Sequence, residues 1–213
     1  IQAGNYEIAE RTAKTLLRRA TEIRFPMLQS WGHYLLGFIN YEWNVTELAA
    51  RQFSEGVDAS FGINLLIARN AMIGQALTSQ ALGHSADALE NLNTLSRIDL
   101  DIHGVEGVDT ASARARLMLV DGDLEAAERW ADLFNAPPAE QSLIVLMEQS
   151  QLTKARILIS RNRGRDIETA MEILDKVGEV AGSSFNIRIT IKVLALRSLA
   201  QLTRGQTARA RET

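Results

Sequence analysis

Apolar and polar residues alternate along this chain with the period of an α-helix, and the clearest example is the segment 30–53. We interpret it as two antiparallel helices that turn at Asn44 and so form one helical hairpin. Its first helix carries aromatic residues at intervals of three, four and three positions, which places the rings on one side: Trp31, Tyr34, Phe38 and Tyr41. Short β-branched runs elsewhere lie inside longer helical patterns. The sequence therefore predicts an all-α fold.

A turn signature recurs along the chain with a period of about forty residues. Each copy has Gly or Asn at the turn, and Ala follows five or six positions later in a short helix. The turn residues are Gly4, Asn44, Gly83, Gly122, Gly164 and Gly205, and the alanines are Ala9, Ala49, Ala88, Ala127, Ala170 and Ala210. Successive turns lie 40, 39, 39, 42 and 41 residues apart. This period predicts a solenoid, a right-handed superhelix of about eleven helices paired in hairpins.

The signature also has a physical interpretation. Gly or Asn supplies the left-handed cap that ends one helix, and the small Ala lets the next helix approach closely. Asp123, Asp166 and Thr46 are predicted to cap the second helices. The first helices of the hairpins are predicted at 27–42, 62–82, 109–121, 139–163 and 184–204. The second helices are predicted at 5–19, 46–59, 85–97, 123–134, 166–180 and from 206 onward.

The composition is that of an ordinary soluble protein, with 46% hydrophobic and 23% charged residues. The 23 basic and 26 acidic residues are interleaved, which argues against direct nucleic acid contact by this segment. Zero cysteines exclude disulfides and thiolate metal sites and agree with a reducing compartment. No apolar run is long enough to cross a bilayer. We expect a cytoplasmic protein without membrane contact.

The sequence carries no signature of catalysis. The histidines His33, His84 and His103 have no companions at metal-ligand spacing, and no nucleophile elbow is present. The acidic segment 99–109 lacks the regular spacing of a calcium loop, so it is predicted to be a solvated turn between repeats. We therefore expect no enzyme, no metal site and no cofactor in this segment.

Two resemblances to known families add to this interpretation. Leu36-Gly37, followed by Asn44, Ala49 and Phe53, resembles a tetratricopeptide repeat, although the period is about forty rather than about thirty-four residues. The longer repeat, with the segment GDLEAAERW between Gly122 and Trp130, resembles the superhelical repeat region of MalT-like, LuxR-type bacterial transcription regulators. In that family an ATPase module precedes the repeats and a helix-turn-helix follows them. The repeats sense an inducer or a protein partner.

The resemblance also bears on domain organisation. The sequence starts in mid-pattern without an initiator methionine, and it contains neither a phosphate-binding G-x-x-x-x-G-K-[ST] loop nor a recognition helix. We expect residues 1–213 to be a single helical-repeat domain taken from a longer protein, without its ATPase and helix-turn-helix modules.

The aromatic stripe has two interpretations. In the tetratricopeptide register set by Leu36-Gly37, Trp31, Tyr34, Phe38 and Tyr41 correspond to positions that usually line the concave groove. A first helix in a solenoid also packs on two sides, so the same rings could belong to the core. As a groove wall, they would stack on a sugar, a planar ligand or an apolar peptide.

Basic residues recur at equivalent positions as well. Arg114, Arg156 and Arg197 each precede a turn glycine by eight residues. As a row they could bind an anion, or each could pair with an acid of a neighbouring helix, such as Glu125, Glu128, Glu168 or Glu172. Arg116 is predicted to be a free cation in the groove, and Lys154 matches the position of Ser112 one repeat later.

The residues and the resemblance together predict an effector-sensing and protein-interaction domain of a MalT-like regulator. The expected partner is a small-molecule inducer or a protein, bound on the concave face at Trp31, Tyr34, Phe38, Tyr41, Arg116 and Lys154. The alternative is a plain tetratricopeptide-like scaffold that binds a peptide or mediates oligomerisation of its parent protein, without a small ligand.

Overall fold

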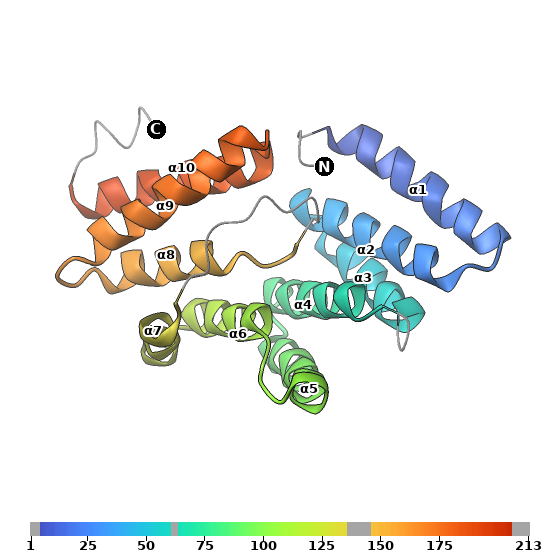
Figure 1. The fold of residues 1–213 in the computed structure, drawn as a ribbon, viewed down its shortest axis with the longest axis horizontal. Helices are drawn as coiled ribbons and strands as arrows, with labels where there is room; N and C mark the ends of the chain where they lie inside the picture. The colour runs from blue at the N-terminus through green and yellow to red at the C-terminus, as the bar shows by residue number, and fades with distance from the viewer. Residues whose placement is uncertain (1–4, 61–63, 136–145, 206–213) are drawn as a thin grey trace. The chain divides into compact units, whose positions relative to one another are not determined.

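The computed structural model describes residues 5–60, 64–135 and 146–205 of the 213-residue chain (Figure 1). Within these ranges it contains ten α-helices and no strand. The earlier helices are α1 (Tyr6–Glu22), α2 (Pro26–Glu42), α3 (Thr46–Ser60), α4 (Leu65–Ala81), α5 (Ser85–His103) and α6 (Val108–Asp121). The later ones are α7 (Leu124–Leu133), α8 (Ser150–Arg161), α9 (Asp166–Ser183) and α10 (Ile187–Thr203). The all-α prediction is confirmed.

The described helices fall into two compact units. The first unit contains residues 5–117 and, returning from much later in the sequence, Leu146–Glu148. The second unit contains the chain from Met118 to residue 135 and from Gln149 to residue 205. That the chain is a single helical-repeat domain stays a prediction.

Consecutive helices pack against each other inside each unit, as expected for helical hairpins. In the first unit this holds from α1 through α5, and α2 also contacts α4 across the intervening α3. In the second unit α7, α8, α9 and α10 pack in sequence, and α8 contacts α10. Each hairpin thus buries its apolar faces between its neighbours, which is the tetratricopeptide-like arrangement that the repeat predicted.

Five turns between helices share one hydrogen-bond pattern, in which an N–H reaches back to the carbonyl five residues earlier. The donor–acceptor distances are 2.8 or 2.9 Å. The residue before each donor has a positive φ, and these residues are Arg24, Asn44, Gly83, Gly122 and Phe185. The predicted caps at Asn44, Gly83 and Gly122 are therefore confirmed. A search for glycine misses Arg24 and Phe185.

Small residues mark the places where helices come closest. The signature alanines Ala49, Ala88, Ala127 and Ala170 are completely buried. The ring of Phe53 lies between two glycines of neighbouring helices, so that a Cβ added at Gly37 or at Gly74 would lie 2.7 Å from its carbon atoms. The Leu-Gly motif of the repeat is thus explained by the aromatic ring that rests on the glycine.

Two predicted boundaries differ clearly from the structure, and a third cannot be compared with it. The helix predicted at 139–163 begins only at Ser150, because residues 146–149 are not helical. The helix predicted at 85–97 continues to His103, so the turn predicted at 99–109 is shorter than expected. The helix predicted from 206 onward lies outside the described residues.

The prediction of a solvated turn is wrong at Asp99. This residue lies inside α5 and is completely buried. Its carboxylate pairs with Arg69 of α4, accepts a hydrogen bond from Thr110 Oγ1 of α6 at 2.6 Å, and accepts another from the Gly107 amide at 2.9 Å. Asp99 therefore ties three helices together, whereas residues 100–105 of the same segment are exposed.

Candidate functional site

The aromatic stripe of α2 divides into buried and partly exposed residues. Tyr34 and Phe38 are buried, with exposed fractions of 0% and 1%, whereas Trp31 and Tyr41 are half-buried. The Tyr34 ring lies 6.2 Å from Trp31, 6.3 Å from Phe38 and 6.2 Å from Phe53, measured between centroids. Tyr34 and Phe38 thus belong to the core of the first unit. Tyr41 accepts a hydrogen bond from a charged side chain, that of Arg116.

A buried carboxylate gathers the polar groups of this region. Glu148 has a side chain that is 1% exposed, and it lies in the first unit just before α8 begins. Ser112 Oγ donates to its Oε1 at 2.9 Å, and Arg116 Nη1 donates to its Oε2 at 3.3 Å. The other guanidinium nitrogen, Arg116 Nη2, donates to the Tyr41 hydroxyl at 3.0 Å. Two residues of α6 therefore bind a carboxylate from a distant segment, and Tyr41 of α2 binds one of these two residues, Arg116.

The main chain beside this carboxylate is also bound. The amide of Met147 donates to Asn70 Oδ1 on α4 at 3.0 Å. Asn70 Nδ2 donates to the Leu66 carbonyl at 3.0 Å, which fixes the orientation of the Asn70 amide. We call Tyr41, Asn70, Ser112, Arg116, Met147 and Glu148 the carboxylate site.

Arg116 keeps its positive charge although burial opposes it. Burial alone lowers the pKa of this guanidinium, but the interactions with Tyr41 and Glu148 together outweigh burial and raise its pKa above the ordinary value. Arg116 is therefore a permanent cation that holds a carboxylate. This arrangement recognises a carboxylate through the charge and hydrogen bond of Arg116 and through a second hydrogen bond from Ser112.

The prediction that Arg116 is a free cation is wrong, because it binds both Glu148 and Tyr41. Lys154 is not free either. Its Nζ donates to the Phe134 carbonyl at 2.7 Å and lies 5.8 Å from the Phe134 ring centroid. Burial lowers the pKa of Lys154, and Asp132 opposes that shift. This lysine therefore holds the end of α7 within the second unit.

Two of the three recurring arginines are paired with acids, which favours the packing interpretation over an anion-binding row. Arg114 donates to Asn93 at 2.7 Å and to Glu106 at 3.1 Å, and Arg197 pairs with Asp175. The acids differ from the four named from the sequence. Each pair links a helix to the element that precedes it.

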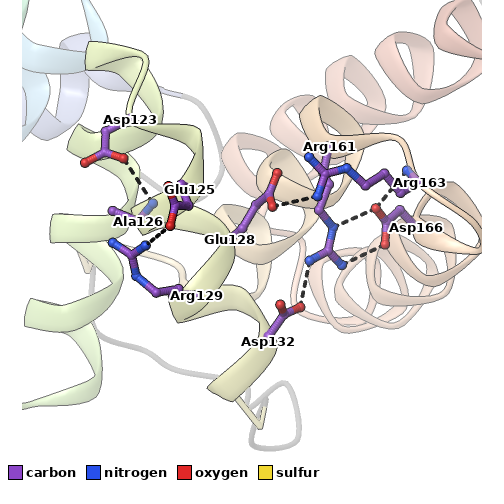
Figure 2. A network of polar contacts seen from close by, with 9 residues as sticks. All are labelled: Asp123, Glu125, Ala126, Glu128, Arg129, Asp132, Arg161, Arg163 and Asp166. Atoms are coloured by element: carbon purple, nitrogen blue, oxygen red, sulfur yellow. Dashed lines mark hydrogen bonds and ion pairs between the residues drawn. The ribbon is translucent and has the colours of Figure 1, made fainter.

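The second unit contains its own polar network, which links α7, α8 and α9 (Figure 2). Arg161, at the end of α8, donates to both oxygens of Asp166 at 2.7 and 2.8 Å and to Asp132 of α7 at 2.7 Å. Arg163 donates to Glu128 at 3.0 Å. Figure 2 also shows Asp123 capping α7 through the Ala126 amide at 3.1 Å, as predicted. The predicted cap Asp166 instead binds the arginine of the preceding helix.

The charges of this network are mutually stabilised. The hydrogen bonds from Arg161 hold the pKa of Asp166 below its ordinary value of 3.8, and burial opposes that shift only in part. The same hydrogen bonds raise the pKa of Arg161. The pair of Arg161 and Asp166 joins the adjoining helices α8 and α9, so it fastens this hairpin.

Other chemistry is not supported by the described part of the chain. The described residues contain no group of three or more histidine or acidic side chains arranged to hold a metal ion. None of the described helices has both the length and the apolar character needed to cross a bilayer. His33 Nδ1 lies 3.1 Å from Gln52 Oε1 and serves to join α2 to α3.

Sequence reasoning missed the residue at the centre of the site. Glu148 was placed inside a predicted helix, and nothing in the local sequence marks it. Helix length is the signal that could have found it. Helix α6, the first helix of its hairpin, begins at Val108, fourteen residues before the turn glycine Gly122. The same distance before the next turn glycine, Gly164, gives Ser150, which is where α8 begins. Glu148 would then precede the helix.

Comparison with known proteins agrees with the repeat and its geometry. The family model for the MalT-like TPR region matches residues 1–213. No curated protein matches the chain in sequence. The match covers the whole length, including the turns and buried alanines described above. We conclude that this chain belongs to the family of MalT-like TPR regions.

Proposed function

We propose that this chain is the effector-sensing and partner-binding region of a MalT-like transcription regulator, and that it binds through the carboxylate site of the first unit. The observation that carries the proposal is one buried carboxylate bound by Ser112 and Arg116, with Arg116 held in turn by the Tyr41 hydroxyl. Tyr41 lies on α2, whereas Ser112 and Arg116 lie on α6, so an effector at this site would contact more than one repeat.

The proposed mechanism is differential binding. An effector that prefers one arrangement of the hairpins stabilises that arrangement by the difference between its two binding free energies. In a solenoid, small shifts at several repeats add along the chain. The site is suited to this role because its groups lie on α2, α4 and α6, which belong to three successive hairpins.

An alternative is a scaffold that binds a peptide and has no small ligand. One contact favours it: Asn70 already accepts a hydrogen bond from a main-chain amide, that of Met147. A side chain that binds main chain suits an extended peptide better than a sugar or a planar ligand. Both candidates use the same residues and involve no catalysis, and both place the protein in the cytoplasm.

A transcription experiment tests the regulatory proposal. Arg116→Ala would be introduced into the complete gene, and transcripts would be compared with those of the wild type and of a deletion strain. Arg97→Ala is the matched control, because Arg97 pairs with Glu90 and both side chains are 67% exposed. We expect Arg116→Ala to change the transcripts that the deletion changes, and Arg97→Ala to leave them unchanged.

Two results would contradict the proposal. If the deletion changes no transcripts, the protein is not a regulator. If Arg116→Ala accumulates to the wild-type level and gives the wild-type transcript profile, the regulator does not use this site.

A further inference from the structure

The segment Leu146–Glu148 is unusual among the connections between helices. At Arg24, Gly83, Gly104 and Phe185 the chain turns on the surface, and neighbouring side chains such as Ile23, Val105 and Phe185 are 66%, 65% and 81% exposed. Met147 and Glu148, by contrast, are 4% and 2% exposed although they belong to no helix. Met147 and Glu148 are therefore buried although the packing of the helices does not require it.

The contacts of this segment are those of a bound peptide. Its main chain is held by the Asn70 side chain at 3.0 Å, and its acidic side chain is held by Ser112 and Arg116 at 2.9 and 3.3 Å. Main-chain hydrogen bonds supply affinity in peptide recognition, and pockets for side chains supply specificity. The binding residues come from the first helices α4 and α6, and Arg116 is in turn positioned by Tyr41 of α2.

Burial of this carboxylate is tolerated only because groups that bind a carboxylate surround it. An ionised carboxylate loses much hydration free energy when it leaves water, and an exposed glutamate in the same short segment would avoid that loss. The partners of Glu148 compensate because they are matched to a carboxylate in charge and in hydrogen bonding. They would be equally matched to the carboxylate of another peptide.

We propose that Leu146–Glu148 is a built-in ligand of the first unit, and that the external partner is an extended peptide segment in which an acidic residue follows an apolar one. The partner competes with this segment for Asn70, Ser112 and Arg116. This inference rests on the proposed function, because it names the occupant of the same site and the way in which the site is regulated.

The tether sets the strength of the competition. A segment attached to its own site competes at an effective concentration of about a millimolar, so an external peptide binds more weakly to the wild-type chain than its intrinsic affinity would give. A substitution that weakens the contacts of Leu146–Glu148 with its site should therefore tighten the binding of the external peptide. If the segment has only a structural role, the same substitution should leave the affinity for the peptide unchanged or lower it, because the site would lose part of its support.

The test uses the full 213-residue chain and a fluorescein-labelled peptide, acetyl-Leu-Met-Glu-Gln-Ser-amide, which copies residues 146–150. Binding is measured by fluorescence anisotropy. We expect Glu148→Ala to bind the peptide at least about tenfold more tightly than the wild type does. Adding Arg116→Ala to Glu148→Ala should abolish the gain, and so should a peptide with Gln in place of Glu.

Equal peptide affinity in the wild type and in Glu148→Ala would overturn the proposal, and so would the absence of binding to both. If Glu148→Ala is poorly folded, a second measurement on the wild type decides. The Met147 methyl group is labelled with ¹³C and assigned through Met147→Leu, and the peptide is added in excess. A shift of its resonance to the position of a solvated methionine supports displacement, and an unchanged resonance refutes it.

The peptide experiment and the transcription experiment fail independently. Peptide competition without any transcriptional effect of the deletion would leave a scaffold with a built-in ligand. A transcriptional effect of Arg116→Ala without peptide competition would leave a regulator whose effector is not a peptide.

Discussion

Asp99 and Glu148 are both buried carboxylates of the first unit, and both are bound by an arginine and a hydroxyl group. Asp99 is held by Arg69 and by Thr110 Oγ1, and it also accepts a bond from the Gly107 amide. Glu148 is held by Arg116 and by Ser112 Oγ. The backbones differ, because Asp99 lies within helix α5 whereas Glu148 lies in a non-helical segment.

This difference in backbone decides what each carboxylate can do. Asp99 can leave its partners only if the last turn of α5 unwinds, so its contacts stabilise the fold as a whole. Glu148 can leave by movement of a few residues with no helix to break. Identical chemistry therefore serves as a structural clamp in one place and as an exchangeable contact in the other. Local opening of low free energy is typical of binding segments.

The largest expected effect is at the clamp. Arg69→Ala leaves the Asp99 carboxylate buried without its cation, and we expect the free energy of unfolding to fall by about 3–5 kcal/mol. Urea denaturation followed by circular dichroism measures this loss. The exposed Arg97 on the same α5 is the control, since Arg97→Ala should change the free energy of unfolding by less than about 0.5 kcal/mol. A loss below about 1 kcal/mol in Arg69→Ala would show that Asp99 is no clamp.

A smaller and local effect is expected at the carboxylate site. Arg116→Ala removes a charged hydrogen bond to Glu148, which should weaken docking of Leu146–Glu148 by about 1.5–3 kcal/mol. Hydrogen–deuterium exchange should show faster exchange of the Met147 amide, while amides of α5 keep their protection. If Arg116→Ala instead lowers global stability as much as Arg69→Ala does, the two carboxylates play the same role and the comparison fails.

The smallest effect is expected in the second unit, where the arginine network is partly exposed. The pKa of Asp166 is lowered in the folded state, so its ionised carboxylate stabilises the hairpin at pH values above its ordinary pKa of 3.8. That stabilisation is lost as the pH falls through the lowered pKa. We expect Arg161→Ala to lower stability near neutral pH by about 1 kcal/mol and to flatten this acid dependence.

Amide exchange of α8 and α9 between pH 3 and pH 6 measures the effect of Arg161→Ala, with the pH range chosen around the ordinary pKa of about 4 for Asp. Arg163→Ala is the matched control, because the Arg163 side chain is 70% exposed and its loss leaves the Arg161–Asp166 pair intact. An unchanged acid dependence in Arg161→Ala would mean that the pair does not stabilise the hairpin. The network would then differ from both carboxylates of the first unit.

The sequence predicts the repeat well because the repeat rests on local chemistry. Glycine or asparagine at a left-handed turn and alanine at a helix crossing are visible in a few neighbouring letters. The left-handed Arg24 and Phe185 escape such a search, because their conformation is imposed by the hydrogen bonds of the turn and not by the residue type. The sequence therefore predicts the hairpin architecture of the described residues, but it does not predict the conformation of every turn.

The candidate site could be predicted only in part. The positions of Tyr41 and Arg116 in the repeat mark them as candidates. The repeat does not show that Arg116 binds Glu148, 32 residues away, or that it binds Tyr41, 75 residues away. A periodic pattern does not report contacts at such separations. The start of α8 was also missed, because Leu146 and Met147 continue the apolar pattern of the following helix.

Phe53 and its two flanking glycines have a consequence for how this protein can change. One ring fills the space left by Gly37 on α2 and by Gly74 on α4, so three hairpin elements are fitted to a single side chain. Excising α3, or exchanging it for the second helix of another repeat, would leave two glycines facing an empty volume the size of a phenyl group. The repeats look like interchangeable modules in sequence, but at this position recombination would have to move all three residues together.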